Sequence, residues 1–169
     1  MSAIPARSPA MGSNSRVAIT VNIQYACKQP GIPDRRRIRR WVRAALAGNP
    51  LRGELTVRIV DEVEGAELNR HWRRRTGATN VLSFPAARAV GVTPDPLGDI
   101  VICAPVVRRE AREQGKKSEA HWAHMVIHGT LHLLGFDHEK AADARTMESF
   151  EIRLLEKLGF PDPYRNASR

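Results

Sequence analysis

The segment His128–His138 reads HGTLHLLGFDH, and its spacing indicates both a local structure and a chemistry. Residues four apart on a helix project from one face, so His128 and His132 are placed to bind one divalent ion. Gly135 favours the left-handed conformation that commonly ends a helix, and the chain then returns with His138 as a third nitrogen donor. Three protein ligands leave a fourth position open for water, which is the arrangement of a catalytic zinc.

The histidine pair alone is weak support for a metal site, because histidines at this spacing also occur as core or capping residues. The third histidine and the helix-ending glycine favour a metal site. Asp137 is either an acceptor for the second N–H of a ligand imidazole or a plain loop residue. Zinc proteases of the His-Glu-x-x-His type carry their general base directly after the first histidine, where this chain has Gly129. The segment therefore argues against peptide hydrolysis and is compatible with attack on a phosphodiester.

The segment resembles the signature of the YbeY family, which comprises single-strand-specific, metal-dependent endoribonucleases acting in ribosomal RNA maturation. Two further stretches resemble motifs of that family in the same order. They are Leu68-Asn69 with Trp72-Arg73 and the TNVLSFP of Thr79–Pro85, and the GDIVI of Gly98–Ile102. The resemblance spans residues 17–164 and departs from the family pattern at Trp72 and Phe136, where the family usually has tyrosine.

The resemblance implies that His128, His132 and His138 bind one zinc ion. It also implies that Arg73 is a functional arginine, contacting the scissile phosphate or the charge that develops there. These four residues are the predicted catalytic set. The implied role is processing of the 3′ end of small-subunit ribosomal RNA and ribosome quality control, with ribosomal subunits and ribosomal proteins as partners. Two alternatives stay open: a ribosome-assembly factor whose zinc is structural, and, less favoured, a zinc peptidase-like hydrolase.

The composition fits a basic domain with a polyanionic partner. The 169 residues carry a formal net charge of +9, which favours association with phosphate backbones, although a merely arginine-rich protein has the same balance. Cys27 and Cys103 lie far apart, which indicates reduced thiols and a cytoplasmic location. No apolar run is long enough to span a membrane. The oligomeric state stays open.

We divide the chain into a disordered basic tail at residues 1–16, a single domain at 17–164 and a flexible tail at 165–169. Whether Met1 or Met11 is the true start stays open. Hydrophobic periodicity predicts strands and helices in mixture. The fold class is therefore α/β (α+β), with a small mixed sheet of about four strands packed with about five helices. The family resemblance adds one antiparallel edge strand and a metal site in a basic cleft.

The expected strands are residues 17–25, 55–59, 79–84 and 98–103, and the expected helices are 35–47, 61–73, 104–115, 118–134 and 140–158. In the second helix we expect Trp72 to be a core anchor rather than a platform for base stacking. His121 and His124 extend the row of histidines, and we interpret them as surface or supporting residues rather than ligands. The last helix should bury a stripe of Met147, Phe150, Ile152, Leu154, Leu155 and Leu158.

Overall fold

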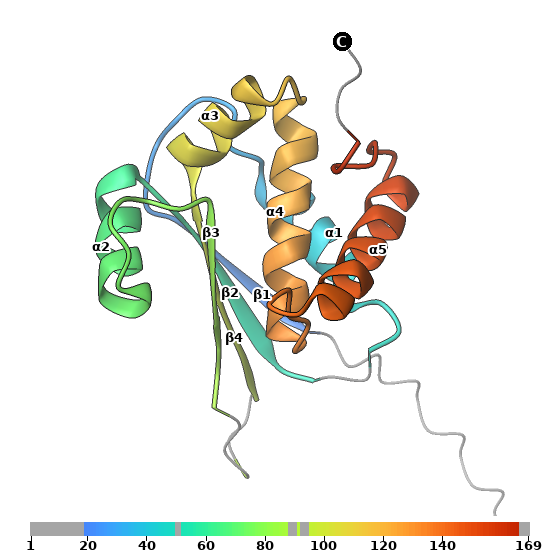
Figure 1. Cartoon of the computed structure of the whole chain (residues 1–169). Helices are drawn as coiled ribbons and strands as arrows, with labels where there is room; N and C mark the ends of the chain where they lie inside the picture. The colour runs from blue at the N-terminus through green and yellow to red at the C-terminus, as the bar shows by residue number, and fades with distance from the viewer. Residues whose placement is uncertain (1–18, 50–51, 88–90, 92–94, 166–169) are drawn as a thin grey trace, which may run out of the picture.

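A computed structural model of the chain describes residues 19–49, 52–87, 91 and 95–165. Within these residues the chain forms four strands and five helices (Figure 1). In chain order they are β1 (Thr20–Tyr25), α1 (Arg35–Leu46), β2 (Glu54–Val60), α2 (Glu62–Arg73), β3 (Val81–Pro85), β4 (Pro96–Cys103), α3 (Ala104–Glu113), α4 (Ser118–Leu133) and α5 (Ala141–Lys157).

The strands form one sheet in the order β1-β2-β4-β3. Strands β1, β2 and β4 run parallel, and β3 lies antiparallel to β4 at the edge. Parallel neighbours require a crossover connection, which α1 provides between β1 and β2. The predicted mixed sheet, its antiparallel edge strand and the α/β class are confirmed.

The main core lies between the sheet and the layer formed by α1 and α4, with α5 packed against α4 (Figure 1). From the sheet, Ile100 and Ile102 point into this core, and α4 contributes Trp122 and Ile127. Helix α4 also contacts α1, α3, α5 and β3, so it is buried on nearly every side. A helix surrounded in this way holds the side chains at its exposed end on a rigid support.

The opposite face of the sheet is covered only in part. A smaller cluster of Val60, Leu82, Val101, Cys103 and Val106 is buried there beside α2 and α3. Farther along the strands this face carries polar side chains, which line an open groove described below.

Helix starts and the first amphipathic stripe agree with the sequence predictions. The Asp34 side chain accepts a hydrogen bond from the backbone N–H of Arg37 at the start of α1, and Asp61 does the same for Glu64 in α2. Both are N-caps that satisfy otherwise unpaired N–H groups. The buried residues of α1 are those its spacing indicates: Ile38, Trp41, Val42, Ala45 and Leu46.

One burial prediction is wrong and a second holds only in part. Trp72 is 61% exposed, because α2 buries only a narrow strip and the tryptophan lies outside it. In α5 the predicted stripe is confirmed for Met147 and Leu155, which are buried, and for Leu154 and Leu158, which pack against the core while partly buried. Phe150 departs from the prediction at 37% exposed, and Glu151 is buried in the same stripe.

The predicted N-terminal tail at residues 1–16 lies outside the described residues, as do residues 166–169, and Val17 of the first expected strand lies there too. The division into tails and domain therefore stays a prediction. Among the helices that the structure describes, none combines the length and the apolar character needed to cross a bilayer.

Candidate metal centre

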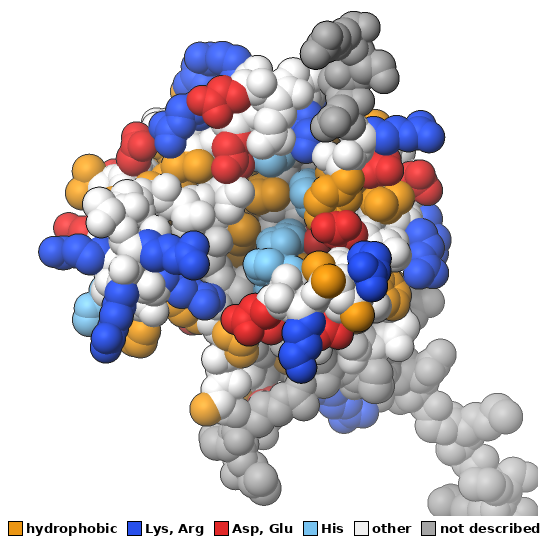
Figure 2. Space-filling model, viewed as in Figure 1, with side chains coloured by type: hydrophobic (Ala, Val, Ile, Leu, Met, Phe, Trp, Pro, Cys, Tyr) orange, Lys and Arg blue, Asp and Glu red, His pale blue; other side chains and the backbone are white. Residues whose placement is uncertain are grey.

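Three histidines converge where α4 ends. His128 and His132 lie one turn apart on the helix, Gly135 follows with a φ of +94°, and the returning loop brings His138 alongside. One ligand nitrogen from each of the three lies within 4.8 Å of the others. Figure 2 shows the histidines gathered in a hollow of the surface, with Lys and Arg side chains over α2 beside them.

The nitrogen positions fit a zinc ion. His128 Nε2 and His132 Nε2 are 3.1 Å apart. Two nitrogens bound to one tetrahedral zinc at the usual bond length lie about 3.3 Å apart. The donor set also suits zinc, since imidazole nitrogen is one of its preferred ligands.

A buried carboxylate sets the orientation of His128. Glu151 Oε1 lies 2.8 Å from His128 Nδ1, and the Glu151 residue is fully buried. An ionised carboxylate only accepts hydrogen bonds, so Nδ1 carries the proton of a neutral His128. The lone pair of that ring is then on Nε2, on the side of His132 and His138.

Glu151 also binds two further donors. Its Oε2 accepts hydrogen bonds from the Tyr164 hydroxyl at 2.6 Å and from His124 Nε2. Burial by itself raises the pKa of Glu151, but the hydrogen bonds from His124 and His128 outweigh it and bring that pKa to about 2. Burial and the neighbouring Glu151 raise the pKa of Tyr164. The carboxylate is therefore ionised and the phenol protonated at neutral pH.

His124, His128 and Glu151 form a second group whose ligand atoms lie within 4.8 Å of one another. Both carboxylate oxygens of this group already accept hydrogen bonds, and both His124 and Glu151 are buried. We therefore interpret the His124–His128–Glu151 group as a support for the cluster of His128, His132 and His138, and not as a second ion site. The row of histidines continues to buried His121, whose Nε2 lies 2.8 Å from Glu110 Oε2.

The His132 imidazole is suited to metal binding at neutral pH. Burial lowers the pKa of His132, and the nearby His128 and His138 rings lower it further. A lowered pKa keeps the imidazole neutral, with a lone pair available to a cation.

Arg73 reaches from α2 to the edge strand and is not part of the histidine cluster. Its Nη2 donates to the carbonyl oxygen of Ser83 at 3.1 Å, and the Ser83 hydroxyl donates to the carbonyl oxygen of Gly129 at 3.0 Å. Two hydrogen bonds thus connect Arg73 to the turn of α4 between His128 and His132. Arg73 and its neighbours Arg70, Arg74 and Arg75 are exposed, so their charge is available to a ligand.

The comparisons with known proteins agree with this geometry. The family model described as "Endoribonuclease YbeY" matches residues 22–159. The chain belongs to the YbeY endoribonuclease family. The endoribonuclease YbeY of Nitrosococcus oceani is 53% identical over 150 residues, which cover 88% of this chain and 98% of that protein. The YbeY of Pseudomonas syringae pv. tomato is 54% identical over 147 residues, covering 86% of this chain and 88% of the relative.

A solved structure also shares the fold of this YbeY chain. The solution structure of TM1509 from Thermotoga maritima matches with a TM-score of 0.53 and 23% identity, covering 85% of this chain and 99% of that one. At this identity the likeness shows the fold alone.

Gly129 fills the position at which zinc proteases of the His-Glu-x-x-His type carry their glutamate, and the structure explains why a YbeY chain folded in this way has glycine there. A Cβ atom at residue 129 would lie 2.7 Å from Ile100 Cγ2 and 3.2 Å from Val81 Cγ2. Position 129 therefore faces the sheet and not the histidine cluster, so a glutamate there would not be directed toward the histidine nitrogens.

Of the two roles that the sequence left open for Asp137, the structure shows the loop role. Asp137 Oδ1 accepts the backbone N–H groups of His138 at 2.7 Å and Glu139 at 3.3 Å, so it shapes the loop. The carboxylate bonded to the His128 imidazole is that of Glu151, which sequence reasoning missed together with Tyr164. A signal was present: Met147, Glu151 and Leu155 recur every four residues, so an acidic residue interrupts a buried stripe.

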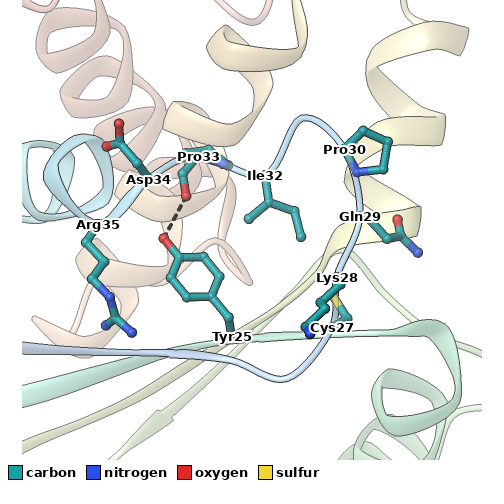
Figure 3. A pocket seen from close by; sticks show the side chains of 9 residues that line it. All are labelled: Tyr25, Cys27, Lys28, Gln29, Pro30, Ile32, Pro33, Asp34 and Arg35. Atoms are coloured by element: carbon teal, nitrogen blue, oxygen red, sulfur yellow. Dashed lines mark hydrogen bonds between the residues drawn. The ribbon is translucent and has the colours of Figure 1, made fainter.

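Another hollow, of about 690 Å³, lies between the β1–α1 loop and the start of α1 (Figure 3). Some of its polar groups are used within the fold: the Tyr25 hydroxyl donates to the Pro33 carbonyl at 2.8 Å. Arg35 Nη1 likewise donates to the Ile23 carbonyl at 2.6 Å.

Proposed function

We propose that this chain is a zinc-dependent endoribonuclease that hydrolyses phosphodiesters of single-stranded RNA. In this proposal His128, His132 and His138 bind one zinc ion, and Arg73 contacts the phosphate. The observation that carries it is the convergence of three imidazole nitrogens within 4.8 Å, beside exposed arginines. Membership of the endoribonuclease YbeY family supplies the class of reaction.

Each side chain has a distinct task. Glu151 holds the proton of His128 on Nδ1 and keeps Nε2 free for the ion. When bound, the ion supplies a Lewis acid for the phosphate and lowers the pKa of water. The planar guanidinium of Arg73 offers paired N–H donors to phosphate oxygens and stabilises the charge that develops on them.

The surroundings favour an unpaired RNA strand as substrate. An unpaired backbone bends into a hollow that a duplex does not enter, and its bases are free to contact protein. The net charge of +9 favours a polyanion. We extend the proposal to ribosomal RNA, with processing of the small-subunit 3′ end, ribosome quality control, contact with ribosomal subunits and ribosomal proteins, and a cytoplasmic location.

The test combines elemental analysis with digestion of a labelled single-stranded RNA and its duplex form. We expect one zinc per chain, cleavage of the single strand, loss of cleavage with a chelator and recovery with added zinc. His132→Ala should stay folded and lose both zinc and cleavage. Undiminished cleavage by the chelated protein would overturn the proposal. Unfolding of His132→Ala would instead support a ribosome-assembly factor with structural zinc.

A further inference from the structure

Trp72 is a large apolar side chain that is exposed and yet held in place. It lies in the last turn of α2 and is 61% exposed. The Phe84 ring meets its ring edge-on at 5.9 Å, and the His71 ring lies 4.8 Å away. Contacts of this kind fix an aromatic ring while leaving one of its faces open.

The ring borders a groove of about 710 Å³ on the open face of the sheet. Its apolar wall consists of Trp72 and Phe84 with Leu68 and Pro85. Its polar floor comes from three strands of the sheet, through the side chains of Gln24, Thr56, Arg58 and Asp99. An aromatic wall above hydrogen-bond donors and acceptors is the arrangement that receives a flat, polar-edged ring such as a nucleobase.

The charge inside the groove differs from the charge on the surface around it. Inside the groove Arg58 is paired with Glu64 at 2.6 Å, and Asp99 adds a negative charge, so the floor does not attract an anion. Positive charge is instead on the exposed arginines around Trp72, at Arg70, Arg73, Arg74 and Arg75. A phosphate backbone therefore fits the rim, and a neutral base fits the interior.

The groove is next to the histidine cluster. Arg73 and Ser83 both line it, and the Ser83 hydroxyl donates to the Gly129 carbonyl between His128 and His132. The sheet edge formed by β3 and β4 therefore carries the groove on one face and the histidine helix α4 on the other. A nucleic-acid strand that crosses this edge passes Arg73 on its way from one site to the other.

From these observations we propose that the Trp72 groove binds an unpaired nucleobase of the RNA, by stacking on Trp72, close to the phosphodiester that reaches the histidines. This inference rests on the proposed function and adds a base-binding subsite to it.

Tryptophan fluorescence tests the inference without cleavage. The other two tryptophans, Trp41 and Trp122, are each 2% exposed, so Trp72 is the one that a ligand reaches. We would titrate the chelated full-length protein with single-stranded oligouridylate and oligoadenylate. We expect the RNA to quench the emission and to protect it from iodide, because stacking covers the open ring face.

Substitution measures the contribution of stacking. Trp72→Ala should weaken binding of both oligonucleotides about tenfold, and Trp72→Phe should restore most of the affinity. An oligonucleotide with one abasic nucleotide, moved along the strand, should lose affinity for the wild type at one position and lose none there for Trp72→Ala. Val63→Ala is the matched control, because Val63 is also exposed on α2, at 69%, and lies in its first turn.

The inference and the proposed function fail in different ways. If the wild type cleaves RNA with zinc while Trp72→Ala binds and cleaves equally well, the base subsite is refuted and the nuclease stands. A groove that serves a protein partner would give that result. If the wild type neither binds nor cleaves RNA, the proposed function fails first. Zinc content should be the same in all variants.

Discussion

Replacing Glu151 by glutamine tests how the metal site is supported. The carboxylate accepts hydrogen bonds from His128 Nδ1, His124 Nε2 and the Tyr164 hydroxyl. Glutamine has the same shape but offers one oxygen and one NH₂ group. If the NH₂ group faces His128, the imidazole must move its proton to Nε2 and loses the lone pair meant for zinc. If it faces His124 and Tyr164, the buried His124 ring and the Tyr164 hydroxyl lose their acceptor.

Both orientations destabilise the metal-free protein. The first replaces hydrogen bonds to a charged acceptor, worth about 1.5–3 kcal/mol each, by neutral ones worth about 1 kcal/mol. The second leaves the buried His124 donor without an acceptor, which costs about 1–3 kcal/mol. We therefore expect the Glu151→Gln apoprotein to be less stable by about 2 kcal/mol, which lowers Tm by roughly 4–8 °C for a chain of this size. Loss of a carboxylate behind a ligand histidine typically weakens metal affinity by about 10- to 100-fold.

The assay is zinc titration against a chelating indicator, with thermal unfolding of the metal-free and zinc-loaded forms. Glu156→Gln is the matched control, since Glu156 is an exposed glutamate on the same helix. Its zinc affinity and Tm should equal those of the wild type. A Glu151→Gln protein whose zinc affinity stays within about twofold of the wild type would refute the supporting role, given the 10-fold minimum expected.

Three further predictions concern Arg73, Gly129 and Glu110. Arg73→Ala should reduce RNA cleavage by about 100-fold or more while zinc affinity stays unchanged, because the guanidinium bonds to a strand carbonyl and not to a histidine. Parallel loss of zinc would contradict this. Gly129→Ala should cost about 1–2 kcal/mol in denaturant unfolding: overpacking against fully buried Ile100 exceeds the gain in helix propensity. Burial raises the pKa of Glu110, but hydrogen bonds from His121 and Asn80 outweigh it and leave that pKa lowered from 4.5. The stability that Glu110 adds is therefore present above pH 4.5 and lost as the pH falls through its lowered pKa, so Glu110→Gln should flatten the acid limb of the stability curve. An unchanged acid limb would argue against this role.

The sequence predicts what depends on local spacing. Asp34 and Asp61 are recognisable as N-caps because the capping bond forms within three residues, and the α1 stripe is visible because one face of that helix meets the sheet. The meeting of His138 with the helical pair also follows from a short segment. Long-range partners are different. The spacing of Met147, Glu151 and Leu155 indicates that Glu151 is buried, but not that it bonds to His128, which lies 23 residues away in the chain.

The prediction for Trp72 failed in another way, because a residue predicted to be buried is exposed. Apolar character alone predicts burial, but whether a residue near the end of a helix is covered depends on how far the sheet extends beneath it. The buried residues of α2 are Gly65 and Asn69, so most of its other side chains, including Trp72 in its last turn, are not covered by the rest of the fold. The residue is then available to a ligand, and its exposure follows from the placement of α2 rather than from its own sequence context.

Gly129 connects the packing of the fold with the chemistry of the site. Because residue 129 has no side chain, α4 approaches β4 and β3 closely enough for its carbonyl to accept the Ser83 hydroxyl at 3.0 Å. Ser83 in turn offers its own carbonyl to Arg73. The spacing between the arginine and the histidines is thus set by the contact of one helix turn with the edge strand. A larger residue at 129 would not add a general base. It would push the ligand helix away from the strand that positions Arg73, so the glycine that argues against peptidase chemistry also maintains the geometry proposed for phosphodiester cleavage.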